Sequence, residues 1–201
     1  LQRLPKGTAG QVLKMNSGAT APEYGDLSSD FVKIVTATGG GANTLDINSC
    51  FSATYENYFI SANFHTSATS NVAIKLLDSS NSVITGNYYY CGTQTQKSSS
   101  SQSETIKAGW NDSYWYPHES QENGTASFAQ YQVFVNKPFV STTQNNFTVE
   151  CNIYDGGSLR HVQSMCRQQN VESMAGIRFF MTSGSSNITN LSKVTVYGIK
   201  Q

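Results

Sequence analysis

Short runs of alternating apolar and polar residues recur along this chain, and they constrain its fold more than any other feature. Residues 58–64, YFISANF, place an apolar side chain at every second position, and residues 129–135 and 147–153 do the same. Successive side chains of a strand point to opposite faces of a sheet, so this pattern predicts strands with one buried face. Residues 176–188 and 194–200 predict two more such strands, joined by a polar loop that contains glycine. Because these strands come last, we expect them to complete a sheet begun much earlier in the chain.

The pattern as a whole predicts an all-β domain. About nine strands can be counted from residue 31 onward, and no segment keeps a helical period for more than about two turns. Two packed antiparallel sheets bury one face of every such strand. We therefore expect a jelly-roll-like β-sandwich over residues 28–201.

Residues 1–27 differ from the rest of the chain. Four glycines and two prolines punctuate a segment with few large apolar side chains. Such a segment cannot bury a core of its own. We therefore expect an extended arm, which is either a flexible tether or an ordered stem that packs against other copies.

The composition is polar without being ionic, and this excludes several classes of partner. Ser, Thr, Asn and Gln make up 76 of the 201 residues, charged residues only 13%, and the formal net charge is zero. Binding to nucleic acid or to an anionic membrane surface requires an excess of Lys and Arg, so neither is expected. Membrane insertion is not expected either, because no apolar run approaches the ~18–20 residues that cross a bilayer.

The four cysteines predict buried free thiols and no metal site. They are widely spaced, without a CxxC pair: Cys50, Cys91, Cys151 and Cys166. If residues 156–157 form a two-residue hairpin turn, Cys151 faces Val162 and Cys166 faces Phe147. The two sulfurs then lie about four residues apart, roughly 13 Å, whereas a disulfide needs Cα atoms within ~7 Å. No zinc ligands cluster, and no cofactor-binding motif occurs, so neither a metal nor a cofactor is expected.

Residues 93–125 break the alternation and carry the candidate binding site. Residues 93–105 are nearly pure Ser, Thr, Gln and Lys and predict a low-complexity loop. Both tryptophans of the chain follow it. Aromatic rings stack on the apolar faces of sugars while neighbouring polar groups bond the hydroxyls. The candidate ligand-binding residues are Tyr88, Tyr89, Trp110, Asn111, Asp112, Tyr114, Trp115, Tyr116 and His118. The alternative, that both tryptophans belong to the core, stays open.

The sequence offers little for catalysis. There is no GxSxG motif, and the three histidines are far apart in the sequence, without HxxxH or HExxH spacing. A glycosidase needs a pair of carboxyl groups, and the candidates for such a pair are Asp112, Glu119 and Glu122. Three acids within one polar loop are weak support for a glycosidase site. We therefore expect no enzymatic activity.

Both ends of the chain resemble a known group of viral proteins. Residues 7–24, GTAGQVLKMNSGATAPEY, resemble the junction that precedes the distal domain in tail-fibre and related surface proteins of tailed bacteriophages, particularly aquatic ones. Residues 177–188, IRFFMTSGSSNI, and 194–199, VTVYGI, are similar to the ending of the same group. Between them, Tyr88-Tyr89-Tyr90 resembles the tyrosine run that follows its central hairpin.

The resemblance implies a fibre or spike head on the virion surface that assembles as a homotrimer in the host cytoplasm. It implies binding to a host cell-surface glycan or protein, with the N-terminal arm contacting other virion proteins. The three copies of the trimer would each make weak contacts with the receptor, and together they would bind the host surface more tightly than one copy does. Two alternatives remain: a capsid or baseplate decoration protein without a receptor role, and a secreted carbohydrate-binding module or glycosidase fragment.

Overall fold

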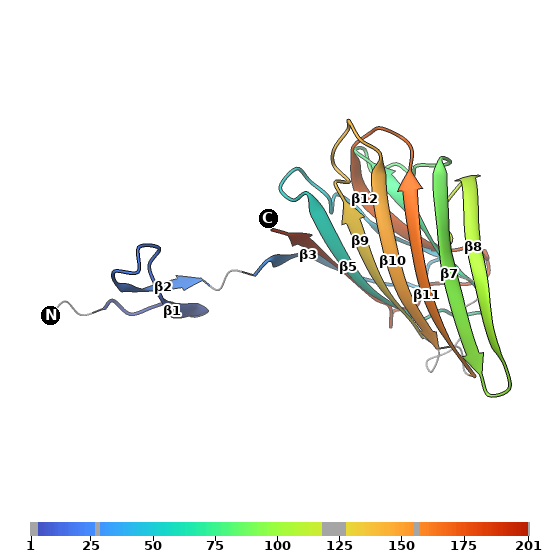
Figure 1. Cartoon of the computed structure of the whole chain (residues 1–201), viewed down its shortest axis with the longest axis horizontal. Coiled ribbons are helices and arrows are strands. Elements are labelled where there is room, and N and C mark those ends of the chain that lie inside the picture. The colour runs from blue at the N-terminus through green and yellow to red at the C-terminus, as the bar shows by residue number, and fades with distance from the viewer. Residues whose placement is uncertain (1–3, 27–28, 118–127, 155–156, 201) are drawn as a thin grey trace. The chain divides into compact units, whose positions relative to one another are not determined.

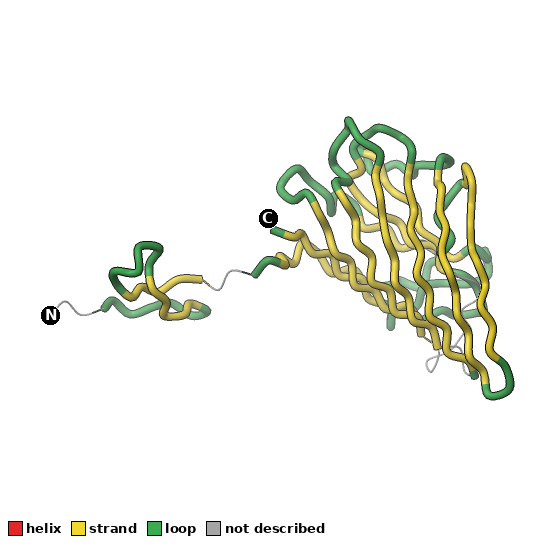
Figure 2. The backbone as a smooth tube through the Cα atoms, in the orientation of Figure 1, coloured by secondary structure: helices red, strands yellow, loops and turns green. Residues whose placement is uncertain are grey.

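The structure is a computed structural model that describes residues 4–26, 29–117, 128–154 and 157–200 (Figure 1). It separates into two compact units, Leu1–Asp30 and Phe31–Gln201. Among the described residues there are thirteen strands and no helix (Figure 2). The all-β prediction is therefore confirmed, although the sequence pattern revealed fewer strands than the structure contains.

The first unit is a small antiparallel hairpin. Strand β1 (Gln11–Met15) pairs with β2 (Pro22–Asp26), with Met15 opposite Pro22. The Asn16 side-chain oxygen closes the connecting turn by accepting a hydrogen bond from the Thr20 backbone N–H at 2.9 Å. Leu13 and Met15 are exposed, as expected of a segment without a core. The paired strands differ from the extended arm that the composition predicts, and the role of this segment as an arm stays a prediction.

The second unit contains a large and a small antiparallel sheet. The strands of the large sheet are, in spatial order, β3 (Phe31–Thr38), β13 (Lys193–Ile199), β5 (Asn57–Phe64), β9 (Phe128–Asn136), β10 (Asn145–Tyr154), β11 (Ser158–Gln168), β7 (Tyr88–Ser98) and β8 (Gln102–Asp112). The small sheet consists of β4 (Thr44–Ile47), β12 (Met174–Met181) and β6 (Val72–Asp78). Figure 1 shows strands β5, β9, β10, β11, β7 and β8 side by side, with β12 behind them.

The order of the strands gives the sandwich its jelly-roll character. Strands β3 and β5 belong to the large sheet, and β4 and β6 belong to the small one, so the chain alternates between layers. The last two strands of the sequence then join one sheet each, β12 the small sheet and β13 the large one. Strand β12 lies between β4 and β6, and β13 lies between β3 and β5. The expectation that the C-terminal strands complete earlier sheets is confirmed.

The core lies between the two sheets and is formed by the alternating positions that the sequence indicates. The apolar residues of 58–64, 129–135 and 147–153 are buried, while most of the residues between them remain partly or fully exposed. Phe64 of the large sheet meets Phe179 of the small sheet with ring centroids 5.0 Å apart. Full burial of such a side chain contributes about 1.5–3 kcal/mol, so this layer supplies much of the stability.

Residues 93–105 form strands, and the loop prediction for them is wrong. They belong to the β7–β8 hairpin, whose turn is closed by the backbone hydrogen bond from Ser98 N–H to Ser101 O at 2.9 Å. No described residue of β8 is buried, because this strand is the edge of the large sheet. A strand exposed on both faces needs no apolar alternation, so its polar composition resembles that of a loop.

The predicted register of the cysteines is confirmed, because Cys151 pairs with Val162 and Cys166 with Phe147 across β10 and β11. All four cysteines are free, and Cys50, Cys151 and Cys166 are buried as predicted. Cys91 is exposed, so the prediction of a buried thiol is wrong for this residue. Burial raises the pKa of the Cys50 thiol to about 12, and it raises the pKa of the other two buried thiols as well. These three residues therefore remain neutral core side chains.

Candidate ligand-binding groove

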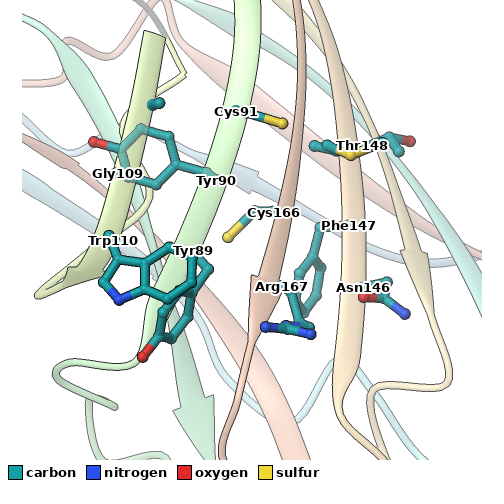
Figure 3. Close-up of a pocket in the computed structure, with 12 residues that line it drawn as sticks. Tyr89, Tyr90, Cys91, Gly109, Trp110, Asn146, Phe147, Thr148, Cys166 and Arg167 are labelled. Carbon is teal, nitrogen blue, oxygen red and sulfur yellow. The ribbon is translucent and has the colours of Figure 1, made fainter.

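A groove of about 630 Å³ lies on the outer face of the large sheet, the face turned away from the small sheet. It crosses β8, β7, β11 and β10, so its walls come from four neighbouring strands (Figure 3). Six outward-pointing residues matter most to its chemistry: Tyr89, Cys91, Trp110, Asn146, Met165 and Arg167.

The register of the strands brings these residues together. Arg167 pairs with Asn146 on one side and with Tyr89 on the other. One row further along the strands, Met165 pairs with Thr148 and with Cys91. Directly opposite residues of an antiparallel pair have neighbouring side chains, so each row forms a continuous strip across the sheet. Tyr89 and Asn146, which are 57 positions apart in the sequence, thereby lie on one surface patch with Arg167 between them.

Trp110 and Tyr89 form the aromatic side of the groove. The Trp110 side chain is 80% exposed, and its ring centroid lies 4.8 Å from that of Tyr89, with the two rings nearly perpendicular at 83°. Figure 3 shows the two rings beside each other on β8 and β7. An exposed indole held by an aromatic neighbour presents a large, rigid apolar face to solvent.

A β-bulge beside Trp110 shapes this part of the hairpin. Tyr90 pairs with Gly109, whereas Tyr88 pairs with Asp112, so β8 carries one extra residue. Asn111 has a φ of 61°, a left-handed conformation that Asn tolerates better than most residues. Its side-chain oxygen accepts a hydrogen bond from the Asn87 backbone N–H at 3.2 Å. Asn111 therefore supports the bulge, whereas the sequence predicts it to be a ligand contact.

Asp112 supports the hairpin from the inner side. Its carboxylate hydrogen-bonds the Tyr90 hydroxyl, and burial together with this carboxylate raises the pKa of Tyr90. Gly109 makes the approach possible, because a Cβ at that position would collide with the Asp112 carboxylate and the Tyr90 ring. Asp112 is therefore a positioning residue of the hairpin.

Among the described residues, Arg167 is the only charged side chain that lines this groove. Its guanidinium carbon lies 5.6 Å from the centroid of the Tyr89 ring, a cation–π arrangement. No carboxylate pairs with it in the described part of the chain, where the ion pairs are Arg178–Asp46 and Lys137–Glu56. Figure 3 shows the Arg167 and Asn146 side chains lying across β11 and β10, opposite the aromatic pair.

Two residues predicted to bind ligand belong to the core instead. Trp115 is 1% exposed, its backbone pairs with Ile74, and its indole N–H donates to Ser164 Oγ at 3.1 Å. Tyr88 is equally buried, and its hydroxyl accepts a hydrogen bond from Leu76 N–H at 2.8 Å. Both side chains fill the space between the sheets. The alternative that both tryptophans belong to the core is therefore correct for Trp115 and wrong for Trp110.

Two further predicted contacts, Tyr114 and Tyr116, do not line the groove. Tyr114 packs against Phe180 of the small sheet, with ring centroids 5.2 Å apart, and Lys75 lies 5.9 Å from the centre of the Tyr114 ring. Tyr116 lies beside Tyr114 at 6.4 Å and does not line the groove. His118, like Glu119 and Glu122, falls outside the described residues.

Sequence reasoning missed the half of the groove contributed by β10 and β11. A hairpin turn at residues 156–157 predicts that Asn146 faces Arg167, in the same register that pairs Cys151 with Val162. Nothing local indicates that β7 pairs with the far side of β11. The neighbourhood of Tyr89 and Arg167 is therefore a long-range property that only the fold reveals.

Two smaller grooves continue the first one along the sheet. One, of about 480 Å³, shares Cys91, Thr148 and Met165 with it and reaches Phe134 of β9. The other, of about 410 Å³, shares Asn146 and Thr148 with it and reaches Ile199 of β13. A continuous depression thus runs from β8 toward the opposite edge of the sheet.

A second aromatic group lies at that opposite end. The ring of Phe59 is 5.0 Å from Phe134, 6.1 Å from Tyr197 and 5.8 Å from Phe31. Phe31 and Phe134 are about half exposed. These four residues are called the Phe59 cluster below.

The described residues hold no group of three or more His, Cys, Asp or Glu side chains that could bind a metal ion. In the same part of the chain, no helix is long and apolar enough to span a bilayer.

Comparison with known proteins yields only remote likenesses. No protein-family model matches the chain, and no curated protein matches it. Among solved structures, peanut lectin with a nine-residue peptide matches at 8% identity and a TM-score of 0.39, covering 96% of this chain and 91% of the lectin. A marine PL-14 alginate lyase from Aplysia kurodai matches at 8% identity and a TM-score of 0.35, covering 94% of this chain and 86% of the lyase. Likeness at this level defines neither an activity nor a ligand for the present chain.

Proposed function

We propose that this protein binds a glycan, without modifying it, in the groove beside Trp110. The observation that carries the proposal is the 80% exposure of Trp110 next to Tyr89, in a groove that also contains the polar side chains of Asn146 and Thr148. Leaving an indole in water forgoes the stabilisation that burial would give, and a large exposed aromatic surface with polar neighbours is typical of a binding site. Sugars match this mixture, since they combine apolar C–H faces with hydroxyl groups.

Within this proposal, the biological setting is a virion fibre or spike head that attaches to a host cell-surface glycan. The resemblance of residues 7–24 and of the C-terminal strands to tailed-bacteriophage fibre proteins supports it. A homotrimer would place several grooves on one particle and raise avidity by ~10²–10⁴ over a single site. The alternatives are a secreted carbohydrate-binding module, with the same groove, and a capsid or baseplate decoration protein.

The Phe59 cluster is the observation that favours a structural role as the second candidate. Half-exposed aromatic rings in contact with one another form the kind of apolar patch that mediates protein–protein contacts. In a decoration protein this patch would be the functional surface, and Trp110 would have no ligand. The two roles differ in which of the two aromatic groups the function requires.

The test compares two exposed apolar residues of the same strand. Trp110→Ala removes the proposed stacking surface, whereas Ile106→Ala removes an equally exposed side chain, 77% accessible, that does not line the groove. On a glycan array and in binding isotherms with the best-bound glycan, we expect Trp110→Ala to weaken affinity at least tenfold, about 1.4 kcal/mol. Ile106→Ala should bind as the wild type does.

Both substitutions are on the surface and should leave the melting temperature nearly unchanged. Equal binding by wild type and Trp110→Ala would contradict the proposal, as would the absence of any bound glycan on the array. Turnover of a bound glycan would contradict the non-enzymatic part alone.

A further inference from the structure

We infer that the glycan is acidic, with a carboxylate on its sugar rings, and that Arg167 determines this specificity. The inference rests on the proposed function and goes beyond it by naming the class of ligand. It follows from the charge, the orientation and the surroundings of Arg167 within the groove.

The first step is the charge of the groove, which differs from that of the whole molecule. The chain has zero formal net charge, yet the twelve residues lining the groove include Arg167 and neither Asp nor Glu. Among the described residues, the neighbouring groove that reaches Ile199 contains no charged side chain, whereas the groove that shares Met165 with the first one contains Glu150. Along the first groove and the groove that reaches Ile199, the one fixed charge of the described residues is therefore the positive charge of Arg167.

The second step is that the guanidinium is held in place and yet has no anionic partner. Tyr89 lies against it at 5.6 Å, and no carboxylate pairs with it among the described residues. The other residues of its row are uncharged: Asn57, Asn136, Asn146, Tyr89 and Ile199. A guanidinium presents five N–H donors in a planar fork that fits a carboxylate with two parallel hydrogen bonds. The contact with the Tyr89 ring is a cation–π contact and uses none of these N–H donors in a hydrogen bond.

The third step is the arrangement of Arg167 between the aromatic pair and the asparagines. A sugar ring stacked on Trp110 would bring its substituents toward Tyr89 and Arg167, one strand and two strands away. The amide of Asn146 on the next strand can bond a ring hydroxyl. The groove thus offers, in order, a stacking surface, a carboxylate-binding group and a hydroxyl-binding group.

The fourth step is the length of the surface, which favours a polymer. From β8 to β9 there are four strand spacings of about 4.8 Å, roughly 19 Å in total. A pyranose ring spans roughly one such spacing, so the first groove and the groove that reaches Ile199, which extends to Phe134 of β9, accommodate an oligosaccharide segment. A linear polyuronate, which repeats a carboxylate on each sugar, fits this length and charge.

The experiment compares polygalacturonate with its methyl ester, which keeps the polysaccharide backbone and removes the charge. Wild type, Arg167→Gln, Arg167→Lys and Trp110→Ala are titrated with each polymer at pH 7, where arginine remains charged. Lys193→Gln serves as the control, because it removes an exposed positive charge from β13, on the same sheet but outside the grooves described above.

We expect wild type to bind polygalacturonate at least tenfold more tightly than the ester, with a preference that shrinks as salt screens the charges. Arg167→Gln should bind both polymers equally and retain the contribution of Trp110. Arg167→Lys should keep only part of the preference, because an ammonium group lacks the planar fork. Lys193→Gln should match wild type, and thermal melts should show that every variant is folded.

Two results would overturn the inference while leaving the proposed function intact. One is equal binding of both polymers by wild type with a loss in Trp110→Ala. The other is a preference for polygalacturonate that persists in Arg167→Gln. Failure of wild type to bind either polymer or any arrayed glycan would instead overturn the proposed function.

Discussion

Trp110 and Trp115 are five positions apart and have opposite environments. Trp110 lies on the open face of the large sheet, whereas Trp115 fills the space between the sheets and donates its indole N–H to Ser164. The bulge at Asn111 and the end of β8 after Asp112 separate the two residues. Residue type alone therefore does not distinguish a binding tryptophan from a structural one, because the distinction depends on which side of the sheet each position faces.

This difference predicts opposite effects on stability. Trp115→Ala should lower the free energy of unfolding by about 3–5 kcal/mol, because it leaves a cavity and removes the indole N–H that donates to Ser164 Oγ. Trp110→Ala should change it by less than about 0.5 kcal/mol. Urea denaturation followed by circular dichroism measures both values. A stability loss below about 1 kcal/mol in Trp115→Ala would contradict the assignment of this residue to the core.

At the scale of elements, the β7–β8 hairpin is the part of the fold that builds the aromatic side of the groove. Tyr89 comes from β7 and Trp110 from β8, and the bulge between them fixes the local twist. A bulge increases the twist of a strand pair and redirects side chains near it. The positions of Asn111 and Gly109 therefore contribute to the groove, although neither has to contact the ligand.

Substitutions at Asn111 test the role of the bulge. Asn111→Ala replaces Asn with a residue that tolerates a φ of 61° less well, and it removes the hydrogen bond from Asn87, so we expect a stability loss of about 1–2 kcal/mol. Asn111→Gly removes the same hydrogen bond but tolerates the backbone angle, so its loss should be smaller. Glycan affinity should fall in Asn111→Ala more than in Asn111→Gly. Wild-type affinity in both variants would show that the bulge does not position Trp110.

The strands differ in how well their sequences predict them. Strands β5, β9 and β10 have one face in the core, so residues such as Ile60, Tyr131 and Val149 alternate with polar neighbours and make the strand evident. Strand β8 has no buried residue, so its sequence carries no such signal. The candidate site was predicted only in part for the same reason. Trp110 and Tyr89 stand out by residue type, whereas Arg167 becomes informative only after β11 is known to lie beside β7.

At the scale of the second unit, the two faces of the sandwich have different surfaces. On the small-sheet side, Arg178 pairs with Asp46, and Lys75 lies close to the rings of Tyr114 and Phe180, so these cations have partners. Desolvation, with the nearby charge of Arg178, lowers the pKa of Lys75. On the large-sheet side, the groove offers the exposed Trp110 ring, the Asn146 amide and Arg167, with which no carboxylate pairs among the described residues. The distribution of paired and unpaired groups, more than the overall composition, distinguishes the face that we propose to bind the glycan.

The central claim, that a glycan binds on the outer face of the large sheet at Trp110, can be tested with one NMR titration. The chain has two tryptophans, so a ¹⁵N-labelled sample gives two indole N–H signals. On addition of oligosaccharides from whichever of polygalacturonate and its methyl ester the protein binds, the Trp110 signal should shift and saturate. The Trp115 signal should stay in place, because its N–H is buried and bonded to Ser164. Saturation of binding without a shift of the Trp110 signal would contradict the account.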